Sequence, residues 1–160
     1  ESDFFIKAKV DGEERLFNVE NFMSAQMRSF PVNDLYELAF EATISGELGQ
    51  GMGEGSIEGI GLGFNLDTPI TVGVYNQPED LPVGFFHARI VYQNVGLSSN
   101  IGKTLFVTDI NDPVSSLEIT ELTQNTIKGK FSGIVQNPIV ENDIVITDGE
   151  FFLELFIGDE

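Results

Sequence analysis

The side chains with the clearest chemical potential in this sequence are oxygen ligands clustered between residues 109 and 112. Asp109, Asn111 and Asp112 fall within four residues, and Pro113 follows at once. Carboxylate and amide oxygens are the ligands that Ca²⁺ prefers in proteins. Asp109, Asn111 and Asp112 are therefore a candidate calcium site. The alternative is a β-turn, because Asp and Asn initiate turns through their own side chains.

The same stretch resembles the D-x-N-D segment with which cadherin repeats bind calcium between domains. The resemblance covers only residues 109–113, and the other acidic ligands of that family do not occur here in a cadherin-like arrangement. It implies a calcium-stabilised adhesion module as one candidate function. A hairpin turn is needed between the strands expected at 103–108 and 114–122 in any case.

Catalytic chemistry has few candidates in this sequence. His87 is the only histidine and cysteine is absent, so thiolate metal sites and catalytic zinc sites with two or three histidines are excluded. A serine triad would have to use His87, which we expect in mid-strand beside Arg89, and no G-x-S-x-G occurs. Neither G-x-G-x-x-G nor a Walker A motif occurs. We predict no enzymatic activity, and no catalytic or cofactor-binding residue.

The charge of the chain limits its partners. Twenty-six acidic residues oppose eight basic ones, which gives a formal net charge of −18. Nucleic acids are excluded, because their binding depends on lysine and arginine neutralising phosphates. The close basic pairs, Lys7 with Lys9 and Lys128 with Lys130, are each too small to form a basic groove. No apolar run approaches the ~20 residues that a membrane-spanning helix needs, so we expect no transmembrane segment.

These side chains must be positioned by β-strands, because apolar residues recur with a period of two along most of the chain. The alternation is clear in 34–45, 85–95 and 151–157, and Ile60, Leu62, Phe64 and Leu66 share a face opposite Gly59, Gly61 and Gly63. Asp11-Gly12 predicts a type I′ hairpin, and Thr147-Asp148-Gly149 predicts another before the last strand. Residues 19–28 favour either a loop with a short helical turn or a further strand.

Residues 46–63 contain eight glycines. The glycine face of their second half predicts either a bent barrel strand with bulky neighbours lying across it, or the floor of a ligand cleft. About ten or eleven short strands at regular spacing predict an all-β fold. We expect one domain over residues 1–160, an antiparallel meander that forms a β-sandwich or a flattened, lipocalin-like β-barrel.

Four segments carry a longer resemblance: residues 5–12 (F-I-K-A-K-V-D-G), 117–122 (L-E-I-T-E-L), 127–133 (I-K-G-K-F-S-G) and 146–151 (I-T-D-G-E-F). Together they resemble small exported lipoprotein domains of Gram-negative bacteria, which are mostly uncharacterised. The resemblance implies a β-sandwich or lipocalin-like fold, a periplasmic or outer-surface location and a lipid anchor upstream of residue 1. It implies no active site, since the matching residues are those of strands and turns.

The sequence therefore predicts a non-catalytic, exported or surface-anchored binding or structural module. One alternative is a lipocalin-like carrier, in which the phenylalanine-rich strands line a cavity for a small apolar ligand. The other is the calcium-stabilised adhesion module. The expected partner is accordingly a small apolar ligand or a surface protein. An internal cavity would favour the carrier, and a packed phenylalanine core would favour the structural module.

Overall fold

The computed structural model describes residues 4–17, 23–32, 37–47, 58–66, 68–76, 86–94, 103–108, 115–137 and 139–159. None of these residues lies in a helix long and apolar enough to span a membrane. The described elements are twelve strands: β1 (Phe5–Val10), β2 (Glu13–Leu16), β3 (Ser24–Val32), β4 (Glu37–Glu47), β5 (Glu58–Leu66), β6 (Gly73–Asn76), β7 (Phe86–Asn94), β8 (Leu105–Thr108), β9 (Ser115–Leu122), β10 (Thr126–Asn137), β11 (Asn142–Glu154) and β12 (Phe156–Asp159).

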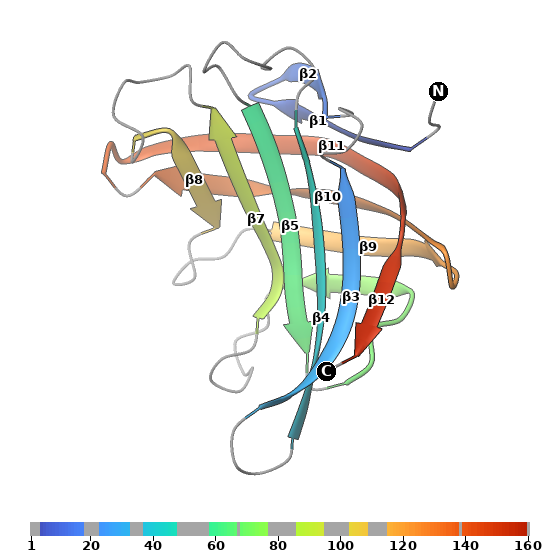
Figure 1. Cartoon of the computed structure of the whole chain (residues 1–160). Coiled ribbons are helices and arrows are strands. Elements are labelled where there is room, and N and C mark those ends of the chain that lie inside the picture. Colours follow the sequence, from blue (N-terminus) through green and yellow to red (C-terminus); the bar gives the residue numbers. More distant parts are fainter. Residues whose placement is uncertain are drawn as a thin grey trace.

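The strands form one sheet that curls strongly into a half-barrel (Figure 1). Its order is β12-β3-β4-β5-β7-β8-β10-β11-β1-β2, while β9 pairs with β10 and with β6. The pairing of β12 with β3 is parallel, and the other described pairs are antiparallel. The all-β fold expected of a sandwich or barrel is thus confirmed. Residues 24–28 of the ambiguous 19–28 region belong to β3, which continues to Val32.

The C-terminal segment contributes a strand to each half of the sheet. β11 lies between β10 and β1, and β12 follows it after the single residue Leu155 and pairs with β3. Phe151, Leu153 and Leu155 are buried, as a central strand requires, whereas Phe156 and Ile157 on β12 are more than half exposed. β11 is therefore a central strand, whereas β12 lies at the end of the strand order.

The core lies on one face of the curled sheet and follows the predicted alternation. Ala42 and Ile44 on β4, and Ile90 and Tyr92 on β7, are buried members of one hydrophobic cluster. Phe17, which follows β2, is fully buried in the same cluster. Burial of these apolar side chains is the main favourable contribution to folding, at roughly 1.5–3 kcal/mol for each large side chain.

The two Asp-Gly signals have different outcomes. Asp11 and Gly12 have φ values of 50° and 85°, and they join β1 to β2 in the predicted hairpin. Asp148, with φ 51°, lies instead within β11, so the second predicted hairpin is wrong. The register of β11 shifts there against both β1 and β10. The Asp-Gly pair thus forms a β-bulge, in which one extra residue bends a continuous strand.

Two glycine–phenylalanine pairs stand side by side on β10 and β11. Gly129 is opposite Phe151, and Phe131 is opposite Gly149. A Cβ atom on Gly129 would lie 2.5 Å from Cζ of Phe151, and one on Gly149 would lie 2.6 Å from Cδ2 of Phe131. Each ring therefore covers the glycine opposite, which explains why the glycines and phenylalanines of these two motifs occur together.

The glycine face of β5 is loosely covered at the two positions described, Gly61 and Gly63. Gly59, Gly61 and Gly63 lie opposite the buried face, and a Cβ atom on Gly61 or Gly63 would meet its nearest neighbours at 3.6–4.0 Å. No bulky side chain of the described residues lies across Gly61 or Gly63. Close packing occurs instead at Gly46 on β4, where a Cβ atom would lie 2.9 Å from the carbonyl oxygen of Phe17.

Candidate functional site

The residues predicted to bind calcium lie outside the described part of the chain. Asp109, Asn111 and Asp112 fall in the undescribed stretch between β8 and β9. His87 lies on β7, but its side chain is not among those described. Within the described residues, no group of three or more His, Asp or Glu side chains is arranged to hold a metal ion. The calcium site remains a prediction.

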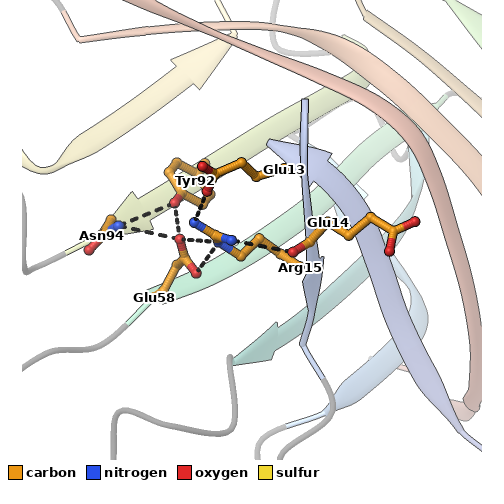
Figure 2. A network of polar contacts seen from close by, with 6 residues as sticks. All are labelled: Glu13, Glu14, Arg15, Glu58, Tyr92 and Asn94. Carbon is orange, nitrogen blue, oxygen red and sulfur yellow. Dashed lines mark hydrogen bonds and ion pairs between the residues drawn. The ribbon is translucent and has the colours of Figure 1, made fainter. Parts of the chain in front are cut away.

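The structure brings together a polar cluster that the sequence analysis did not single out. We call it the Glu58 network; it consists of Glu13 and Arg15 on β2, Glu58 at the start of β5, and Tyr92 and Asn94 on β7 (Figure 2). Glu58 and Tyr92 are 6% and 2% exposed. A buried carboxylate is stable only when hydrogen bonds and an opposite charge replace its hydration.

Three side chains satisfy the Glu58 carboxylate. Nε of Arg15 lies 3.2 Å from Oε2 and 3.3 Å from Oε1 of Glu58. The Tyr92 hydroxyl and Nδ2 of Asn94 both donate to Oε1, the latter at 3.3 Å. Glu58 and Asn94 are register partners, so the pairing of β5 with β7 sets this geometry. Arg15 is opposite Ala8 and therefore points toward the core face, where its guanidinium reaches the carboxylate.

The electrostatics of the Glu58 network keep Tyr92 and Arg15 protonated at neutral pH. Burial and the neighbouring Glu58 carboxylate raise the pKa of Tyr92, so its hydroxyl keeps its proton and acts as a donor. The hydrogen bond to Glu13, together with Glu58, raises the pKa of Arg15 above its usual value. Every buried polar side-chain atom of the described residues has a hydrogen-bond partner. The network is suited to holding β2 against β5 and β7.

The sequence did contain a signal for Glu58. Ile60, Leu62 and Leu66 are buried, and Glu58 lies two residues before Ile60 on the same strand. Because side chains alternate between the two faces of a strand, Glu58 falls on the core face with them. Its partner Tyr92 lies on the core face of β7 for the same reason. The identity of Arg15 as the third member could not be found this way, because β2 and β5 are distant in the sheet order.

A second feature is an open depression of about 930 Å³ on the sheet face opposite the core. We call it the outer trough. It crosses β9, β10, β11, β1 and β2, so it extends about 19 Å at the usual strand spacing. Phe131 and Gly149 lie at the bulge between its two rows of side chains.

Charges alternate along the first row of the outer trough. Glu118, Lys130 and Glu150 are successive register partners on β9, β10 and β11, and Lys7 on β1 is opposite Glu150. Nζ of Lys7 lies 3.3 Å from Oε2 of Glu150. Leu16, which is 45% exposed, ends the row on β2. Lys130 has no ion pair with any residue of the described ranges.

The second row is richer in hydroxyl groups. Ser116 and Ser132 are register partners on β9 and β10, and Thr147 is opposite Lys9. Nζ of Lys9 lies 3.3 Å from Oδ2 of Asp148 at the bulge. Each of the two lysine pairs was too small by itself to form a basic groove. Because β11 alone separates β1 from β10, Lys7, Lys9 and Lys130 from these pairs lie around the same surface.

The lining of the outer trough is formally neutral. Four of the eight basic residues of the chain line it (Lys7, Lys9, Arg15 and Lys130), together with four acidic ones (Glu14, Glu118, Asp148 and Glu150). The other 22 acidic and four basic residues account for the whole net charge of −18. Since the guanidinium of Arg15 is engaged with Glu13 and Glu58, three lysines face four carboxylates in the trough itself.

Comparisons of the chain with protein-family models, with curated proteins and with solved structures give no match. The chemistry of the two features therefore follows from the residues of this chain alone.

Proposed function

We propose that this protein is a non-catalytic binding module and that the outer trough is its binding surface. The observation that carries the proposal is the distribution of charge. A chain with a net charge of −18 gathers three of its eight basic residues, Lys7, Lys9 and Lys130, around one depression and balances them there with carboxylates and hydroxyls. Ligand sites are concave, and convergent polar groups in them fix the orientation of the ligand.

An exported or surface-anchored location, with a lipid anchor upstream of residue 1, is part of the same proposal. Its support is the resemblance of residues 5–12, 117–122, 127–133 and 146–151 to small exported lipoprotein domains. The strands of these segments, β1, β9, β10 and β11, are also four of the five that form the outer trough. The location and the binding surface thus rest on the same part of the chain.

A carrier of a small apolar ligand is the second candidate, and it would use the interior instead. The phenylalanine-rich strands favour it, but the buried side chains of the described strands pack into one hydrophobic cluster that includes Phe17, Phe106 and Phe151. Side chains that pack against one another in such a cluster leave less room for a ligand than an open cavity would. The outer trough is therefore the better supported binding surface.

The test is a fragment screen of ¹⁵N-labelled protein by NMR, with a library of anionic, cationic, neutral polar and apolar compounds. Saturable shifts that map to residues of the outer trough, such as Ser132 and Thr147, are the expected result. The neutral apolar dye N-phenyl-1-naphthylamine reports on the carrier alternative. Shifts confined to core residues such as Ile90 and Phe106, together with enhanced dye fluorescence, would replace the proposal by the carrier.

A further inference from the structure

We propose that the ligand of the outer trough is an uncharged, polyhydroxylated chain, of the chemical class of a neutral oligosaccharide. This inference rests on the proposed function and adds the class of ligand to it. It follows from the charge of the trough, from its hydrogen-bonding groups and from its shape.

The charge of the molecule selects against charged ligands. A polyanion would meet the lysines of the trough but would be repelled by the net charge of −18 around them. A polycation would be attracted to the acidic surface elsewhere, and it would meet the ammonium groups of Lys7, Lys9 and Lys130 inside the trough. An uncharged ligand meets no net repulsion, and the near balance of three lysines and four carboxylates in the trough suits it.

The hydrogen-bonding groups match those of sugar hydroxyls. A hydroxyl group is both a donor and an acceptor, so neighbouring hydroxyls are best met by a donor beside an acceptor. The pairs Lys7–Glu150 and Lys9–Asp148 each place an ammonium and a carboxylate 3.3 Å apart. Lys130 lies between Glu118 and Glu150 in the register and adds a further donor between two acceptors.

The shape of the trough suits an extended chain. Two rows of polar side chains run across five strands over about 19 Å, with about 7 Å between the rows at the usual strand rise. Leu16 provides an apolar contact at the β2 end, where the C–H face of a sugar ring could lie. Aromatic stacking contributes little, because the ring of Phe131 is almost wholly buried. We therefore expect millimolar affinity.

The experiment is a titration of the ¹⁵N-labelled protein with a panel of neutral oligosaccharides that spans α- and β-linked hexose and pentose chains. We expect at least one of them to shift the amides of Ser132, Thr147 and Lys130 saturably. The dissociation constant should be the same in 20 mM and 300 mM NaCl, since screening acts only on charged partners. Oligogalacturonate and a lysine-rich peptide serve as the charged comparisons.

Lys130→Met is the decisive variant, because it removes a charged donor from the middle of the first row. Loss of such a hydrogen bond should weaken binding about tenfold. Lys128→Met is the matched control: it lies two residues away on the same exposed face of β10, is not part of the trough lining, and should leave the affinity unchanged. Thermal melts confirm that both variants are folded.

Three outcomes would overturn the inference. The first is that no neutral oligosaccharide causes a saturable shift. The second is that Lys130→Met and Lys128→Met weaken oligosaccharide binding equally. The third is that oligogalacturonate or the lysine-rich peptide binds more tightly than the neutral chains and in a salt-dependent way. If fragments of another class still bind the outer trough, the proposed function stands and only the ligand class is wrong. If nothing binds there, both fail.

Discussion

At the scale of single residues, the Glu58 network shows how one buried charge can fix the position of a hairpin. Glu58 accepts from Arg15, Tyr92 and Asn94, which lie on two other strands. The hairpin β1–β2 thereby gains a polar attachment to β5 and β7, in addition to the packing of Phe17 against Gly46. Removing one partner of such a cluster costs more than the contact contributes, because the remaining groups stay buried and unpaired.

Glu58→Ala should therefore lower the free energy of unfolding by about 2–3 kcal/mol, since it leaves Nε of Arg15 and the buried hydroxyl of Tyr92 without their acceptor. Urea denaturation measures the loss. Glu13→Ala is the matched control, because Glu13 also pairs with Arg15, at 2.7 Å, but its side chain is 70% exposed. Its cost should be below about 0.5 kcal/mol. Equal losses in the two variants would mean that burial of Glu58 is not what matters.

The contribution of Tyr92 to the stability of the folded protein depends on pH in the alkaline range. Its pKa is raised in the folded protein, first by burial and then by Glu58. Near pH 10 the unfolded chain releases this proton while the folded protein retains it, so the folded state binds more protons and its stability falls as the pH rises further. Below that pH the contribution is fully present.

Tyr92→Phe should accordingly flatten the loss of stability above pH 10. The measurement is urea denaturation of both proteins at several pH values between 8 and 11.5, compared as differences. The variant will be less stable at pH 8, because the hydroxyl that satisfies Glu58 is absent. The gap between the two proteins should narrow as the pH increases. A gap that is constant over this range would contradict a raised pKa.

At the scale of elements, glycine has two distinct roles in this sheet. Gly129 and Gly149 are required by the phenylalanine rings that cover them, whereas Gly61 and Gly63 lie where a methyl group has room. The distinction cannot be made from glycine content, because it depends on which strand lies alongside. Residues 46–63 contain eight glycines, but the glycines where an added Cβ atom would lie closest to its neighbours are Gly129 and Gly149.

Gly129→Ala and Gly61→Ala form a matched pair of variants in central strands. At Gly129 the new methyl group would lie 2.2 Å from the carbonyl oxygen of Glu118, and β9 and β10 must separate to admit it. We expect a loss of about 1–3 kcal/mol in the free energy of unfolding. At Gly61 the nearest atom would be 3.8 Å away, so alanine should be neutral or slightly stabilising. Urea denaturation compares them, and a similar loss in both would refute the close packing at Gly129.

At the scale of the whole molecule, the acidic surface governs the response to cations. A net charge of −18 destabilises the compact state by self-repulsion, so any divalent cation that screens it will raise the melting temperature. A specific calcium site must therefore be separated from screening. Magnesium makes that separation, because it requires a smaller and more rigid octahedral site.

The predicted site at Asp109, Asn111 and Asp112 should raise the melting temperature in calcium by several degrees more than in magnesium, after removal of metals with EDTA. Saturation at a hundred times the dissociation constant adds about 2.7 kcal/mol. Asp109→Ala and Asp112→Ala should abolish the difference. An equal rise with both cations would leave these residues as a turn and remove the adhesion-module alternative.

Several features of this protein follow from its sequence by itself. The period-two pattern identifies most of the strands and the buried residues of β4 and β7, and Asp11-Gly12 identifies the first hairpin, because both depend on neighbouring residues only. The motif I-T-D-G-E-F was assigned to a hairpin, yet it forms a bulge within β11. An Asp-Gly pair is compatible with a hairpin turn and with a β-bulge. Here the pairing of β11 with both β1 and β10 decides in favour of the bulge.

Only the tertiary structure decided which distant residues meet. Strand order places β11 between β1 and β10 and so gathers Lys7, Lys9 and Lys130 around one trough. The curl of the sheet carries Arg15 on β2 to Glu58 on β5, 43 residues along the chain. Local patterns contain no information about such contacts, because alternation fixes the face of each side chain but not which strand becomes its neighbour.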